Sequence, residues 1–109
     1  MDAHEFGILP KTPEHGERYD TYNAKTYDCI SIPDEDLYPL LWDMEVLSCY
    51  SHTVDIPCHG LVYCGITLIP PTAAREMLWM TKPHPALAPL TVLLEKAEKE
   101  NRFVIHYGL

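Results

Sequence analysis

The sequence predicts one α+β domain whose four-stranded antiparallel sheet has the ferredoxin-like order β-α-β-β-α-β, with the helices on one face. This prediction rests on the order of strand and helix patterns along the chain and on a leucine stripe near its C-terminal end. The strand patterns lie at 27–32, 46–53, 61–69 and 103–107. The helical patterns lie at 37–43 and 72–100.

Short-range signals define the first strand and the first helix. Ile30 and Ile32 alternate with small residues, as one face of a strand does, and Pro33 ends the pattern. Acidic residues follow at 34–36, and carboxylates favour the first turn of a helix because its backbone amides are unpaired there. We therefore expect a short helix directly after the first strand.

The sequence patterns of the two middle strands differ in clarity. The pattern at 46–53 alternates weakly, which favours an edge strand, whereas 61–69 is apolar or β-branched on both faces and favours a central strand. The helical region after it is divided near Pro83 and Pro85, and its second half carries the leucine stripe of an amphipathic helix. The last strand then closes the sheet.

Residues 1–24 show neither a strand period nor a helix period. We therefore expect an irregular N-terminal arm before a single α+β domain at 25–109. No apolar run is long enough to span a bilayer, and the acidic N-terminus lacks the apolar segment of a secretory signal. These features predict a cytoplasmic protein without a membrane partner.

The charge of the chain is unevenly distributed. The 109 residues carry a formal net charge of −8, and no Lys or Arg lies between Lys25 and Arg75. Phosphate groups are repelled by such a surface, so we expect no nucleic-acid partner. A basic protein or a cation is electrostatically compatible with it.

The predicted sheet has one face without helices. In a ferredoxin-like sheet the strands at 27–32 and 61–69 are central neighbours, so this face gathers aromatic side chains. We expect ligand or partner contacts there, made by Tyr27, Tyr63, Tyr50, His52 and His106.

Three explanations fit an aromatic open face. Two copies of the chain can pack face to face as a homodimer, because tyrosines suit half-wet interfaces. The N-terminal arm can fold across the face and cover it. The face can also bind a ligand, since the placement of its aromatics resembles that of the RNA recognition motif. The basic residues and the glycine- and aromatic-rich consensus of that motif are missing here.

The central hairpin contains cysteine and histidine residues that suit zinc by type. The low-ranking candidates are Cys58, His59 and His52. Their spacing forms neither a CxxC nor an HxxxH pair, so we expect buried thiols and exposed histidines rather than a metal site. Cys58 beside His59 is also a possible nucleophile, but no known nucleophile motif surrounds it.

No GxGxxG, P-loop, HExxH or GxSxG motif is present. We therefore expect a small accessory protein that binds itself or a protein partner through the aromatic sheet face, without catalysis and without a cofactor. Two alternatives stay open. The chain can be an enzyme or small-ligand binder with a pocket on the open sheet face, or a zinc protein that uses the hairpin's Cys and His residues.

Overall fold

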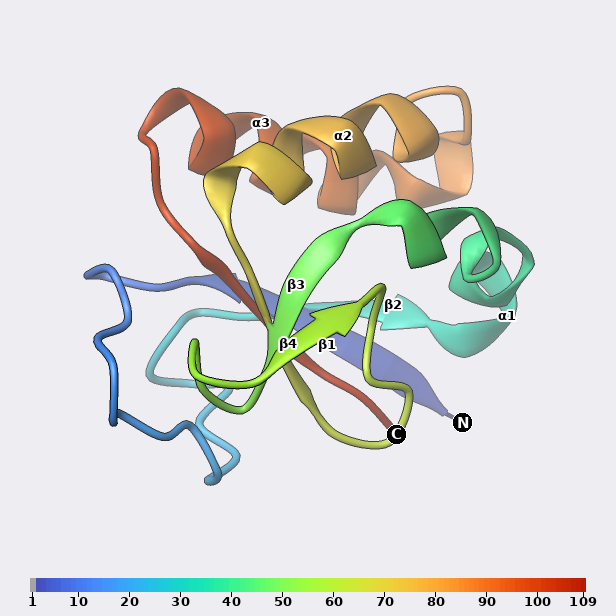
Figure 1. Cartoon of the computed structure of the whole chain (residues 1–109). Helices are drawn as coiled ribbons and strands as arrows, with labels where there is room; N and C mark the ends of the chain where they lie inside the picture. The colour runs from blue at the N-terminus through green and yellow to red at the C-terminus, as the bar shows by residue number, and fades with distance from the viewer. Residues whose placement is uncertain (1) are drawn as a thin grey trace.

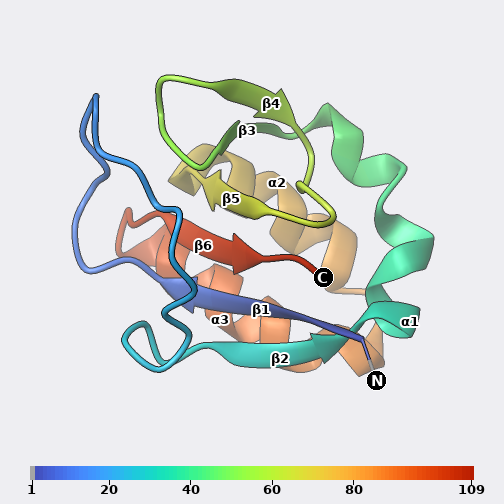
Figure 2. The same cartoon turned by 90° about the horizontal axis from the view of Figure 1, so that it is seen from below.

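The computed structural model, which describes residues 2–109, contains one antiparallel sheet of six strands. The strands are β1 (Ala3–Ile8), β2 (Ile30–Pro33), β3 (Ser48–Ser51), β4 (Pro57–His59), β5 (Ile66–Ile69) and β6 (Val104–Tyr107). Their order across the sheet is β2-β1-β6-β5-β3-β4 (Figure 2). β2 and β4 are therefore the two edge strands.

The helices lie beside the sheet and on one of its faces. They are α1 (Asp34–Leu37), α2 (Pro71–Thr81) and α3 (Ala88–Lys99), with short 3₁₀ segments η1 (Tyr38–Leu40), η2 (Asp43–Val46) and η3 (Pro85–Leu87). α2 and α3 pack against each other above the sheet, while α1 and the turns after it lie at one side (Figure 1). Among residues 2–109, no helix combines the length and the apolar character needed to cross a bilayer.

The α+β class is correct, but the predicted four-stranded ferredoxin-like order is wrong. β1 pairs with both β2 and β6 and so separates strands that the prediction placed together. β4 adds a further strand at the opposite edge. As a result β2, predicted as a central strand, is an edge strand far from β5.

β1 was assigned to an irregular arm because its inward face is not uniformly apolar. His4, Phe6 and Ile8 point toward the helices, and the first of these is a fully buried histidine. Glu5 and Gly7 occupy the opposite face. A polar side chain at an inward position hides the period of a strand unless its hydrogen-bond partners are known.

The strand predicted at 61–69 is confined to its last four residues, β5. The preceding residues form a turn that includes Val62 and Tyr63. Ile66 and Leu68 belong to the cluster on the face away from the helices, opposite to the predicted orientation, while Ile69 faces the helices. The main core fills the space between the sheet and α2 with α3.

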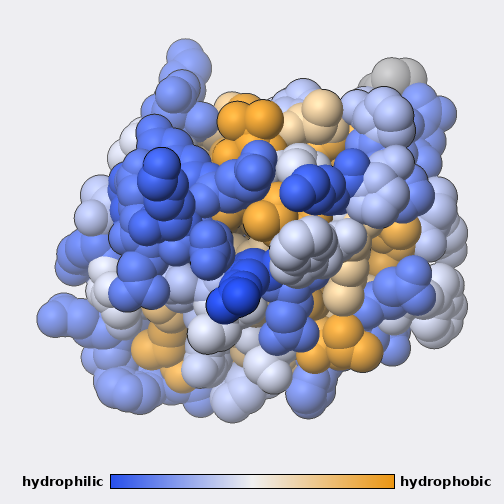
Figure 3. Space-filling view, turned by 90° about the horizontal axis from the view of Figure 1, so that it is seen from above, coloured by the Kyte–Doolittle hydropathy of each residue, from blue (hydrophilic) through white to orange (hydrophobic). Residues whose placement is uncertain are grey.

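Seen from the helix side, the surface is mostly hydrophilic, and apolar side chains appear in separate small patches (Figure 3). The exposed large apolar residues on these two helices are Trp79 on α2 and Val92 on α3, one on each. The surface formed by α1, η1 and η2 is therefore of greater interest for binding.

Candidate functional site

The sheet face away from α2 and α3 is covered. A second cluster of buried side chains fills it: Leu9, Ile66, Leu68, Ile105 and Tyr107. Tyr19, Tyr27 and Cys29, from the segment between β1 and β2, pack against this cluster. Figure 2 shows that segment crossing the sheet on the side opposite the helices. The segment between β1 and β2 therefore covers this face. It comprises residues 9–29 and so extends beyond the arm predicted at 1–24; from here on we call this segment the arm.

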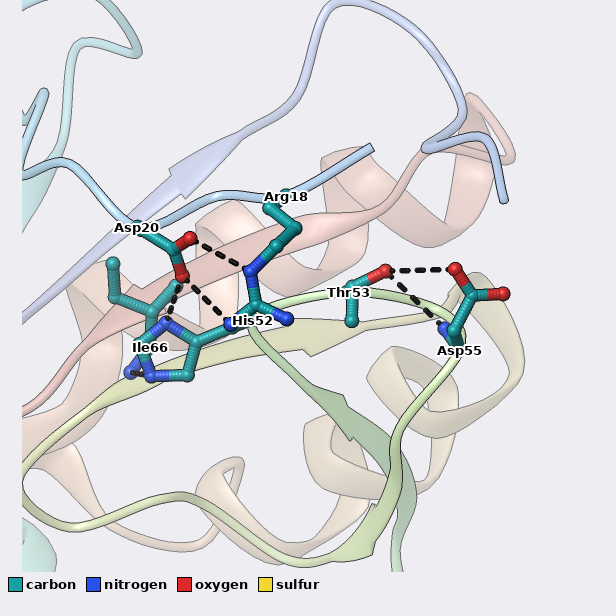
Figure 4. Close-up of polar contacts among 6 residues, drawn as sticks. All are labelled: Arg18, Asp20, His52, Thr53, Asp55 and Ile66. Atoms are coloured by element: carbon teal, nitrogen blue, oxygen red, sulfur yellow. Dashed lines mark hydrogen bonds and ion pairs between the residues drawn. The ribbon is translucent and has the colours of Figure 1, made fainter. Parts of the chain in front are cut away.

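Polar contacts hold the arm to the turn between β3 and β4 (Figure 4). Asp20 accepts hydrogen bonds from the Arg18 guanidinium at 2.8 Å and from His52 Nδ1 at 3.0 Å. The other ring nitrogen of His52 accepts the backbone N–H of Ile66 at 3.3 Å. Both nitrogens of His52 are therefore engaged, and this residue fixes the arm to the sheet.

A hollow of about 650 Å³ lies beside the arm and is lined by Glu5, Tyr22 and Cys29 among others. The hydroxyl of Tyr22 donates to Glu5 across it. Burial raises the pKa of the Cys29 thiol to about 11, so this thiol stays protonated at neutral pH.

The five residues predicted to form the partner surface lie in different parts of the molecule. Tyr27 and Tyr50 pack in the cluster under the arm, and His52 lies in the turn after β3. His106 is fully buried on the helix side of β6. Tyr63 lies in the turn before β5, where its ring contacts other aromatic residues.

Tyr63 and His106 are nevertheless connected by a line of hydrogen bonds, which we name the buried histidine chain. It consists of Asp34, His4, His106 and Thr67. The heavy-atom distances are 2.8 Å from Asp34 Oδ1 to His4 Nε2, 2.9 Å from His4 Nδ1 to His106 Nε2 and 3.0 Å from His106 Nδ1 to Thr67 Oγ1. Tyr63 joins at the Asp34 end, since its hydroxyl donates to Oδ2 at 2.7 Å.

One arrangement of protons satisfies every member of this chain. His4 Nε2–H donates a hydrogen bond to the carboxylate of Asp34, and His4 Nδ1 accepts one from His106 Nε2–H. His106 in turn accepts the hydroxyl proton of Thr67, whose oxygen accepts the backbone N–H of Val62 at 2.8 Å. Both rings are neutral in this arrangement. Burial lowers the pKa of His106 to about 3, with a smaller contribution from His4, which agrees with a neutral ring.

The sequence reasoning missed His4 and Asp34, the two residues that complete the chain. Hydrogen bonds from Tyr63 and then His4 lower the pKa of Asp34. The same carboxylate raises the pKa of Tyr63 to about 12. All four ring nitrogens of His4 and His106 have hydrogen-bond partners. The buried histidine chain therefore links α1 to β1, β6 and β5 through side-chain hydrogen bonds.

Next to Tyr63 lies a groove of about 350 Å³, which we name the aromatic groove. Its lining residues are Tyr38, Leu41, Trp42, Glu45, His59, Leu61 and Tyr63. The side chain of Trp42 is 74% exposed and that of Tyr38 is 55% exposed. Sequence reasoning treated 37–43 only as a short helix with a leucine face, yet Tyr38 and Trp42 are four residues apart on its other side.

The surroundings of the aromatic groove are acidic. α1 consists largely of Asp34, Glu35 and Asp36, and η2 contributes Asp43 and Glu45. The groove itself has no Lys or Arg in its lining. An exposed aromatic groove flanked by carboxylates favours a ligand that is both apolar and positively charged.

The proposed zinc ligands do not converge. In residues 2–109, no three His, Cys, Asp or Glu side chains are placed to hold a metal ion. Cys58 is the cross-strand partner of Cys49 in β3 and β4, whereas His59 lines the aromatic groove and His52 binds the arm. Burial raises the pKa of Cys58 as well, so it is a poor nucleophile.

No model of a known protein family, no curated protein and no solved structure matches this chain.

Proposed function

We propose that this chain is an accessory protein that binds a basic protein partner through the aromatic groove and the acidic surface around it. The observation that carries the proposal is the 74% exposure of Trp42 at the edge of a groove with carboxylates nearby. Tryptophan and tyrosine are the side chains most often found at the energetic centre of protein interfaces. Leaving them in water is unfavourable unless a partner covers them.

Charge supports a basic partner rather than a second copy of the chain. A symmetric dimer through this surface would place the acidic residues of both copies, Asp43 and Glu45 among them, in one interface. Like charges opposed across an interface are unfavourable. A partner rich in Lys or Arg would instead be attracted over a distance of about 10 Å at moderate salt.

The titratable groups support binding without catalysis. The ring nitrogens of His4 and His106 all have hydrogen-bond partners. Burial raises the pKa of Cys49 to about 12 and also raises that of Cys58, so neither thiol is an activated nucleophile. The groups with shifted pKa values are thus engaged in structural contacts.

Calorimetric titration with a short peptide of alternating arginine and leucine tests the proposal. We expect binding that weakens as salt is added, and no binding of the same peptide with glutamate in place of arginine. Trp42→Ala should lower the affinity by about tenfold, as truncation of an interface tryptophan does. Trp79→Ala is the matched control, because Trp79 is 63% exposed on α2 and lies outside the groove.

Equal losses in the Trp42 and Trp79 variants would contradict the proposal, as would equal binding of the acidic peptide. A dimer in light scattering that becomes a monomer in Trp42→Ala would show self-association through this surface instead.

A further inference from the structure

We infer that the aromatic groove holds one arginine side chain of the partner, with its guanidinium between the rings of Tyr38, Trp42 and Tyr63 and near the carboxylate of Glu45. This inference rests on the proposed function, since it names the group by which a basic partner is held. The groove volume of about 350 Å³ is at the small end of the range for ligand pockets. It therefore suits a single side chain rather than a helix or a folded segment.

The rings of the groove are arranged as a corner. Tyr38 and Tyr63 meet edge to face, with ring centroids 6.3 Å apart and planes at 75°. In an edge-to-face pair at least one of the two rings keeps both of its faces uncovered by the other ring, so a ring face is left for a planar group. Trp42 adds a third ring from the segment that follows Tyr38, and aromatic faces attract cations through their electron density.

The charges at the groove favour a cation. Glu45 is the carboxylate among the lining residues, and a guanidinium can bind it through two parallel hydrogen bonds. The hydroxyl of Tyr63 donates a hydrogen bond to Asp34. A phenol that donates to a carboxylate gains electron density, which strengthens its attraction for a cation.

The two exposed tryptophans provide a comparison within the molecule. The ammonium of Lys82 lies 4.9 Å from the ring centroid of Trp79, so this indole already has a cation. Among residues 2–109, no Lys or Arg side chain is placed over the ring of Trp42. The ring of Trp79 is thus already in contact with a cation of the chain, whereas the ring of Trp42 is available to a cation of a partner.

The test uses blocked arginine and blocked citrulline, which has nearly the same shape without the charge. The indole N–H signal of each tryptophan is followed by NMR, after assignment with the Trp79→Phe variant. We expect blocked arginine to shift the Trp42 signal saturably and to leave the Trp79 signal in place. Citrulline should bind roughly tenfold more weakly, and blocked lysine should fall between the two.

Variants identify the groups that hold the cation. Glu45→Gln should weaken arginine binding severalfold, whereas Glu95→Gln, on the exposed side of α3, should not change it. Tyr38→Phe keeps the ring and should bind as the parent does, while Tyr38→Leu should bind more weakly. Circular dichroism of each variant checks that the fold is retained.

The outcomes separate this inference from the proposed function. Equal shifts with arginine and citrulline would overturn the arginine inference, because charge would then be irrelevant. Failure of blocked arginine to bind, together with Trp42-dependent binding of the arginine–leucine peptide, would overturn the inference and leave the proposed function standing. Failure of both the blocked arginine and the peptide would overturn both.

Discussion

At the scale of single residues, His4 and His106 form side-chain hydrogen bonds inside the core between the sheet and the helices. Both are fully buried, and their contacts run from Asp34 at the surface to Thr67 on β5. Every buried side-chain nitrogen and oxygen among the described residues has a hydrogen-bond partner. Such a network is tolerated only when all its members are satisfied, so each member is sensitive to substitution.

The lowered pKa of His106 predicts how the free energy of unfolding depends on pH. Its pKa is about 3 in the folded chain and about 6.5 when it is exposed by unfolding. Between these values the unfolded state binds a proton that the folded state does not, so stability is complete above pH 6.5 and falls as the pH is lowered toward 3. Urea unfolding at pH values from 6.5 down to 4.5 should already show this loss of stability. In that range glutamate side chains, whose ordinary pKa is 4.5, are mostly charged and contribute little to the change.

NMR of the ring protons gives the direct measurement. The His106 signal should stay at its neutral position between pH 8 and 5. A His106 ring that titrates near pH 6.5 would show that it is not held neutral.

Thr67 offers a second test, because Thr67→Val preserves the volume of the side chain and removes its hydroxyl. His106 Nδ1 and the backbone N–H of Val62 then lose their partner in the core. We expect the free energy of unfolding to fall by about 2 kcal/mol, the cost of leaving buried polar groups unpaired. Thr26→Val, at an exposed site, should change it by less than about 0.5 kcal/mol. Equal effects would show that the hydroxyl is unimportant.

At the scale of elements, the sequence signals were strong for those that bury an unbroken apolar face. The leucine stripe of α3 and the proline-bounded division between α2 and α3 can be recognised because packing and local propensity agree. β1 could not be recognised, because the hydrogen-bond partners that allow its histidine, His4, to be buried lie on β6 and α1, far away in the sequence. β4 has only three residues, too few to show a period.

The position of β1 predicts the result of a deletion. The pattern-based boundary at residue 24 implies that 25–109 can fold alone, whereas the sheet order implies that it cannot. Without β1, the strands β2 and β6 lose their common neighbour and Phe6 leaves the core. Residues 25–109 should therefore show no cooperative unfolding transition by circular dichroism. A cooperative transition close to that of the full chain would contradict the central role of β1.

At the scale of the whole molecule, charge and aromatic exposure separate the surface into distinct regions. The acidic segment α1 lies at one side of the molecule (Figure 1). Near the C-terminal end of α3, by contrast, Lys96, Lys99 and Arg102 alternate with glutamates, and Arg102 pairs with Glu100. The absence of Lys and Arg from 26–74 could be recognised in the sequence. That charge pattern is electrostatically compatible with a basic partner, which is the partner class that we propose.

The groove residues were harder to predict than the charge. Tyr63 and His59 were both considered, but with other neighbours and other roles. Tyr38 and Trp42 were overlooked, although aromatic residues four apart on the outer side of a predicted helix are a recognisable signal. Their meaning depends on Tyr63, which a turn brings to them from a distant part of the chain.

The most direct test of the binding account is a map of amide chemical shifts during titration with the arginine–leucine peptide. We expect the largest shifts at 34–46 and 57–63, the segments that form the aromatic groove and its acidic surroundings. The arm at 10–29 and the exposed side of α3 should change little. Shifts concentrated on the arm or on α3, or no shifts at peptide concentrations that saturate the calorimetric signal, would contradict the account.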